Sequence, residues 1–153
     1  MTLMQKEIFE QPRALEECIN FNRETLESLV KTLKEKNVSN VVVAARGTSD
    51  HAGIYGKYLI ESLVGVPVGL SACSVVTLYG GKIDYKNMLV IGISQSGAAA
   101  DVLAVLNQAK ACGAVTVSVL SLIHILHPSE RAKSLSLRSI SSTRIRSSKA
   151  ELI

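Results

Sequence analysis

The sequence predicts an α/β protein built on a doubly wound parallel sheet. Short apolar runs alternate with segments of helical periodicity, and the connections between them are short. The runs consist almost wholly of Val, Ile, Leu, Ala and Gly, which is typical of parallel strands covered on both faces. A chain of 153 residues is long enough for one domain with a hydrophobic core.

The first predicted element is a helix over residues 13–36. Apolar residues recur there at three- and four-residue spacing, with Glu, Lys and Arg between them. Because it precedes the sheet, we expect it to pack on one face or to bridge to a neighbouring domain. A strand is predicted at 41–45 and a helix at 50–63, with Gly65 as the C-terminal stop of that helix.

The remaining predicted elements are a strand at 66–70, a brief helix at 72–78, a strand at 88–93, a helix at 98–112 and a strand at 115–120. The residues of the last helix expected to face inward are Val102, Leu103, Val105, Leu106 and Ala109. We predict the strand order 2-1-3-4, which makes the first and third strands neighbours where the order reverses. Ligands of such sheets bind beyond the carboxyl ends of the strands at that point.

The sequence pI of about 9.1 does not indicate a nucleic-acid partner. Residues 1–120 hold 11 basic and 11 acidic side chains, and residues 121–153 hold 6 and 2, so the net charge of +4 belongs to the C-terminal segment. That segment contains nine Ser, no Gly and no clear periodicity. We therefore divide the chain into a lead-in segment at 1–12, a domain at 13–120 that is truncated at its C-terminus, and a disordered or non-native tail at 121–153.

Neither a membrane nor an oxidising compartment is indicated. No apolar run approaches the length of a membrane span, and the N-terminus lacks the apolar stretch of a signal peptide. Cys18, Cys73 and Cys112 are odd in number and far apart, which predicts buried free thiols in the cytoplasm. His124 and His127 lack further ligands, so we expect no metal, and no dinucleotide or P-loop motif indicates a cofactor.

The turn Ser94-Gln95-Ser96-Gly97 connects the third strand to a helix. Hydroxyl groups, an amide side chain and backbone N–H groups converge there under the positive end of the helix dipole, which favours a bound phosphate. The alternative interpretation is local, with Ser96 acting only as the N-cap of the helix.

A second polar loop, Gly47-Thr48-Ser49-Asp50, follows the first strand and is expected beside the Ser94–Gly97 turn. Thr48 and Ser49 are candidates to bind sugar hydroxyls or phosphate, with capping by Ser49 or Asp50 as the alternative. Arg46 could pair with a phosphate, with Asp50 or with a surface carboxylate. His51 is a candidate acid or base, although a structural role is the alternative.

Three stretches carry a family resemblance: 4–12 (MQKEIFEQP), 45–53 (ARGTSDHAG) and 91–97 (IGISQSG). Together they resemble the SIS (sugar isomerase) domain family, and within it the isomerase half of glutamine–fructose-6-phosphate aminotransferases and deaminase-like relatives. The resemblance implies a flavodoxin-like SIS fold. It implies that the Ser94–Gly97 turn holds the phosphate of fructose 6-phosphate or glucosamine 6-phosphate, and that Thr48 and Ser49 contact the sugar phosphate.

The resemblance also implies a fragment of an amino-sugar-phosphate isomerase that works with a tandem SIS domain and as a homodimer. Family members often have Glu-Thr where this chain has Ala98 and Ala99. The general base is expected outside residues 1–120, so the catalytic residues stay unassigned and no turnover is expected from this chain alone. The alternative is a module that senses a sugar phosphate for a regulator, but such regulators carry a helix-turn-helix before the domain.

Overall fold

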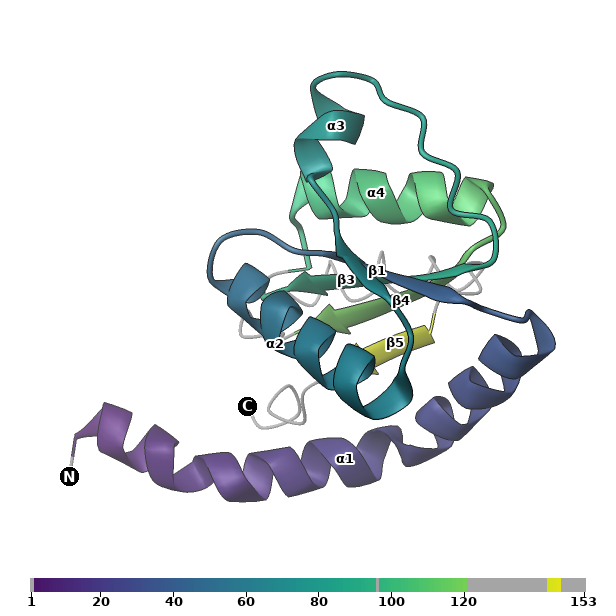
Figure 1. The fold of residues 1–153 in the computed structure, drawn as a ribbon. Coiled ribbons are helices and arrows are strands. Elements are labelled where there is room, and N and C mark those ends of the chain that lie inside the picture. The colour runs from purple at the N-terminus through teal and green to yellow at the C-terminus, as the bar shows by residue number, and fades with distance from the viewer. Residues whose placement is uncertain (1, 96, 121–142, 147–153) are drawn as a thin grey trace, which may run out of the picture.

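The computed structural model describes residues 2–95, 97–120 and 143–146, which form a parallel sheet between two layers of helices (Figure 1). Its strands are β1 (Asn40–Ala44), β2 (Val68–Leu70), β3 (Met88–Ser94), β4 (Val115–Leu120) and β5 (Thr143–Arg146). The strand order is β2-β1-β3-β4-β5, and each neighbouring pair is parallel. The predicted doubly wound α/β class and the order of the first four strands are confirmed.

The helices are α1 (Leu3–Glu35), α2 (Thr48–Val64), α3 (Cys73–Thr77) and α4 (Ala100–Ala111). α1 and α2 lie on one side of the sheet and α3 and α4 on the other (Figure 1). Alternate residues of β1 serve the two sides, since Val41 and Val43 join the core under α1 and α2 while Ala44 joins the core under α4. Each side of the sheet therefore has its own apolar core.

α1 begins at Leu3, so the predicted start at residue 13 was wrong. Thr2 is the N-cap: its Oγ accepts a hydrogen bond from the Gln5 N–H, and Gln5 Oε1 accepts one from the Thr2 N–H. This capping box starts the helix early. Pro12 lies inside the helix, where its missing N–H leaves one backbone carbonyl without its usual donor. The segment predicted as a separate lead-in is thus the first part of α1.

α1 packs on the sheet along a narrow strip, as the prediction of packing on one face requires. Asn22 and Leu29 are buried, whereas Leu15, Ile19 and Val30 are at least half exposed.

Five residues of α4 were predicted to face inward. Val102, Val105, Leu106 and Ala109 are buried as predicted, but the prediction was wrong for Leu103, which is 42% exposed. A helix over a single sheet buries only one stripe, and Leu103 lies at the margin of that stripe.

The C-terminal segment contributes β5 to the described structure. For residues 121–153 the sequence predicts no element, yet Thr143–Arg146 pair in parallel with the last four residues of β4, from Val117 to Leu120. Residues 121–142 and 147–153, which include His124 and His127, lie outside the described residues. The prediction that this segment as a whole does not belong to the domain stays a prediction.

Candidate functional site

The two polar loops follow neighbouring strands. β1 and β3 run in parallel, with Ala44 paired to Gly92, so both strands end at the same edge of the sheet. The order reverses between them, because β1 continues through α2 to β2 while β3 continues through α4 to β4. The predicted adjacency of the two strands is confirmed, and it gives the loops a common edge.

The loop after β1 opens α2 without a side-chain cap. Gly47 is the N-cap residue, with φ +58°, and Thr48 and Ser49 are the first two residues of the helix. The N-cap position proposed for Ser49 or Asp50 is therefore wrong, and the Asp50 N–H donates to the Gly47 carbonyl instead, at 3.1 Å. Thr48 is exposed and Ser49 is half-buried, so hydroxyl groups lie at an N-terminus whose N-cap residue, Gly47, has no side chain to cap it.

The turn after β3 is held by a local hydrogen bond. Ser94, the last residue of β3, accepts a hydrogen bond at its Oγ from the Gly97 N–H, at 3.2 Å. Gly97 has φ +69°, a left-handed conformation that glycine adopts without strain. Gln95 is exposed, and Ser96 lies outside the described residues. α4 begins at Ala100 with Ala99 as its N-cap residue, so the N-cap position that the alternative interpretation gave to Ser96 falls elsewhere.

An ion pair joins the segments that flank the two polar loops. Arg46 Nη1 lies 2.7 Å from Asp101 Oδ2, which connects the loop after β1 to the first turn of α4. The sequence left the partner of Arg46 open among a phosphate, Asp50 and a surface carboxylate, and it did not single out Asp101. The signal was the strand order, since adjacent β1 and β3 bring the first turn of α4 within reach of Arg46.

Cys73 is buried near enough to this ion pair for both of its charges to act on the thiol, and its Sγ lies 4.0 Å from the Ala45 carbonyl oxygen. Burial raises the pKa of the Cys73 thiol, and the Asp101 carboxylate adds to the rise while Arg46 opposes it. A thiol that stays protonated is a weak nucleophile at neutral pH. His51 is exposed on α2. The described residues thus offer donors for an anion, and we assign none of them as a general base.

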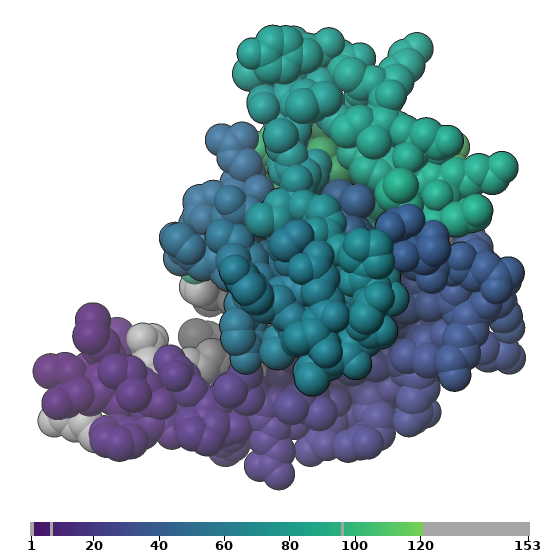
Figure 2. All heavy atoms as spheres, in the orientation of Figure 1, coloured from purple at the N-terminus to yellow at the C-terminus, as the bar shows by residue number. Residues whose placement is uncertain are grey.

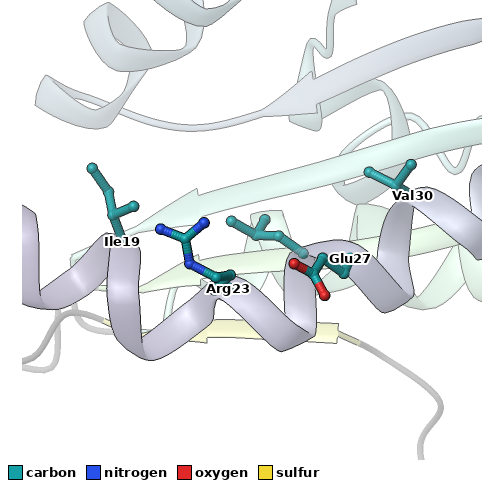
Figure 3. Close-up of a pocket in the computed structure, with 5 residues that line it drawn as sticks. Ile19, Arg23, Glu27 and Val30 are labelled. Atoms are coloured by element: carbon teal, nitrogen blue, oxygen red, sulfur yellow. The ribbon is translucent and has the colours of Figure 1, made fainter.

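Neither a cluster of metal ligands nor the groove on α1 belongs to this site in the part of the chain that the structure describes. Within residues 2–95, 97–120 and 143–146, no three His, Cys, Asp or Glu side chains gather around a possible metal position. An open groove of about 390 Å³ runs along α1, and its lining residues project from one side of that helix (Figure 3): Ile19, Arg23, Leu26, Glu27 and Val30. The groove contains no residue of the two polar loops.

The space-filling view shows α1 as a ridge along the bottom of the molecule, below α2 (Figure 2).

None of the described helices is long and apolar enough to cross a membrane. Cys18, Cys73 and Cys112 are free thiols, as predicted, although only Cys73 is fully buried.

Known proteins share both the sequence and the fold. The chain is 39% identical over 122 residues to the glutamine–fructose-6-phosphate aminotransferase (isomerizing) of Halobacterium salinarum. The matched region covers 76% of this chain and 20% of that protein. The C-terminal domain of glucosamine-fructose-6-phosphate aminotransferase from Francisella tularensis superposes with a TM-score of 0.68 at 27% identity, covering 97% of this chain and 40% of that one. The chain spans about a fifth of the length of the curated relatives it matches.

A protein from Silicibacter pomeroyi with a proposed phosphosugar isomerase activity has the same fold, with a TM-score of 0.79 at 27% identity over 95% of this chain and 42% of that one. The SIS domain family itself matches residues 32–122, which contain β1 to β4 and both polar loops. The chain therefore belongs to the SIS domain family, whose members are phosphosugar-binding proteins and isomerases.

Proposed function

We propose that this SIS domain binds a hexose 6-phosphate, with the phosphate held between the Ser94–Gly97 turn and the start of α2. The observation that carries the proposal is the parallel pairing of β1 with β3, because it brings both polar loops to one edge of the sheet. Each loop leads into a helix, and the N-cap residues of the two helices, Gly47 and Ala99, make no side-chain cap. Backbone N–H groups and hydroxyls at such helix starts favour an anion.

Different parts of the ligand would meet different residues. Ser94, Gln95, Ser96 and Gly97 would bind the phosphate, and Thr48 and Ser49 would contact a phosphate oxygen or a sugar hydroxyl. The Ser94 hydroxyl accepts from the Gly97 N–H, so its own proton remains free to donate to a ligand. Ala98 and Ala99 supply no further hydroxyl, which predicts weaker binding than a site that has one there.

The names of the relatives supply the candidate sugars. Glutamine–fructose-6-phosphate aminotransferases share 36–39% identity with this chain over residues that include both loops, so we propose fructose 6-phosphate and glucosamine 6-phosphate as ligands. The chain would then contribute a binding domain to an amino-sugar-phosphate isomerase, together with a tandem SIS domain and in a homodimer. We propose that the chain alone binds without turnover, because isomerisation requires a positioned base.

The test is a titration followed by amide chemical shifts in NMR. Fructose 6-phosphate and glucosamine 6-phosphate are expected to shift the signals of both loops, whereas fructose without phosphate is not. Ser94→Ala, Ser96→Ala and Ser49→Ala should each weaken binding at least about tenfold, since a hydrogen bond to a charged group contributes about 1.5–3 kcal/mol. Ser28→Ala, on the exposed surface of α1, is the matched control. Unchanged affinity in all three site variants with the fold intact would overturn the proposed site.

A further inference from the structure

Asp101 uses both oxygens of its carboxylate. Oδ1 accepts a hydrogen bond from the Val102 N–H at 2.9 Å, and Oδ2 accepts one from Arg46 Nη1 at 2.7 Å. The first bond satisfies an N–H group in the first turn of α4, and the second reaches across to the loop after β1. The Asp101 side chain thereby connects the start of α4 to the segment that leads into α2.

The pair lies directly beside both turns. Arg46 immediately precedes Gly47, the N-cap of α2, and Asp101 is the second residue of α4, four residues after Gly97. The Arg46 side chain is 61% exposed and that of Asp101 is 25% exposed. Exposed ion pairs add little to the stability of a fold. We therefore look for the effect of this pair in the position of the two polar loops and in the charge near the site, and not in the stability of the fold.

The charges of the pair act on an anion in opposite directions. A carboxylate in the first turn of α4 repels a phosphate bound at that turn, and the Arg46 guanidinium offsets this repulsion. Arginine has five N–H donors on a planar fork, and the bond to Asp101 engages only one of its nitrogens. No residue of the described ranges engages the other donors of Arg46, which can therefore face a ligand.

We infer that Arg46 and Asp101 are a positioning pair for the phosphate site, in which Asp101 orients Arg46 and fixes the spacing of the two turns. This inference rests on the proposed function. Arg46 acts on the ligand as a positive group that is held in place, and Asp101 acts through Arg46. Removal of Arg46 alone is the most harmful change, because it takes away the attraction and also leaves the Asp101 charge uncompensated beside the anion.

The test is a double-mutant cycle on the affinity for fructose 6-phosphate. Arg46→Gln is expected to weaken binding about tenfold or more, since charge-assisted bonds are the stronger class. Asp101→Asn is expected to weaken binding less, about threefold, because it loses the orientation of Arg46 but also removes a repelling charge. The double variant R46Q/D101N should bind more tightly than R46Q, which a merely additive structural role does not produce.

Two comparisons separate charge from folding. Fructose 6-sulfate carries one charge fewer than the phosphate dianion, so the loss caused by R46Q should be smaller for it. Arg13→Gln breaks the Arg13–Glu17 pair of α1 and is the matched control, with no expected change in affinity. Urea unfolding should show that R46Q, D101N and the double variant all fold, with midpoints close to that of the natural chain.

The outcomes separate this inference from the proposed function. If R46Q binds as tightly as the natural chain while Ser94→Ala does not, the positioning pair is overturned and the phosphate site stands. Strictly additive losses in R46Q and D101N would overturn the pair in the same way. If the natural chain binds neither hexose phosphate, the proposed function fails, and the positioning pair fails with it.

Discussion

Gly92 in β3 lies so close to Leu106 in α4 that a Cβ atom at Gly92 would come within 2.6 Å of Leu106 Cδ1. The same Cβ would lie 3.0 Å from Val102 Cγ1. The absence of a side chain at Gly92 thus lets α4 rest directly on the strand that ends in the Ser94–Gly97 turn. This contact holds α4, which carries Asp101 in its first turn, close against β3.

Gly92→Ala is expected to lower the free energy of unfolding by about 1–3 kcal/mol, because an added methyl in a packed core forces its neighbours to shift. Urea denaturation measures the loss. Gly69→Ala in β2 is the matched control, since a Cβ there meets only Val42 Cγ2 at an ordinary 3.9 Å. Equal losses in the two variants would show that α4 does not approach β3 as closely as the structure describes.

Gly97→Ala is expected to weaken hexose 6-phosphate binding as well as stability. An alanine at φ +69° is strained by about 1–2 kcal/mol, and its Cβ would lie 3.3 Å from Leu120 Cδ1. A shift of the Leu120 side chain can relieve the contact, but the backbone strain is relieved only by moving the turn that contains Ser94.

Gly113→Ala controls for the strain alone, because Gly113 has φ +79° and a Cβ atom there would have no described atom within 4 Å. It should lose similar stability while its affinity for fructose 6-phosphate stays unchanged. NMR titration and urea denaturation of both variants make the comparison. A loss of affinity in Gly113→Ala as large as in Gly97→Ala would remove the special role of the turn.

The fold was predictable from local patterns that the structure reproduces. The apolar runs became β1 to β4, and β4 has the predicted bounds of residues 115–120. Parallel strands with short crossovers leave few possible orders, so the neighbourhood of β1 and β3 followed from the alternation of elements. Gly65 ends α2 in the left-handed conformation that its place in the sequence predicted.

The features that the sequence did not predict depend on contacts between distant residues or on weak local interactions. The Arg46–Asp101 pair joins residues far apart in the chain, and periodicity carries no information about which charges meet. The early start of α1 depends on the reciprocal bonds of Thr2 and Gln5, which begin the helix at Leu3 although Pro12 lies inside it. The exposure of Leu103 depends on where α4 sits over the sheet.

Tyr85→Phe is expected to be neutral or to stabilise the fold by up to about 1 kcal/mol, because an unpaired buried hydroxyl costs free energy. Tyr85 is 1% exposed, and neither its Oη nor the buried Ser71 Oγ has a partner of hydrogen-bond geometry among the described residues. Burial raises the pKa of Tyr85, and the nearby Ser71 hydroxyl opposes that rise without cancelling it.

Thermal and urea unfolding of Tyr85→Phe, Ser71→Ala and the double variant measure this effect. Tyr85→Ala is the comparison for packing and should lose about 3–5 kcal/mol, since it removes a buried aromatic ring. A loss above about 1 kcal/mol in Tyr85→Phe would show that the hydroxyl is paired in solution and that the buried polar atoms are satisfied.

The stability of the fold is expected to decline as the pH rises above about 8.5, the ordinary pKa of a thiol, because of Cys73. Burial, with smaller contributions from Asp101 and Asp50, raises the pKa of Cys73 in the folded chain. Below the pKa of the unfolded chain the thiol is protonated in both states, and the stability is complete. Above it the unfolded chain releases its proton first, so the free energy of unfolding falls until the folded thiol ionises too.

Urea unfolding in a reducing buffer at pH 7, 8, 9 and 9.5 measures this decline, which a single group limits to about 1.4 kcal/mol per pH unit. The range ends below the ordinary pKa of tyrosine, because burial also raises the pKa of Tyr85 and adds a later decline. Cys73→Ala should flatten the profile between pH 8 and 9.5. Cys18→Ala, which retains Cys73, should keep the decline of the natural chain. An unchanged slope in Cys73→Ala would show that another group controls the alkaline loss of stability and that Cys73 is not shielded by the fold.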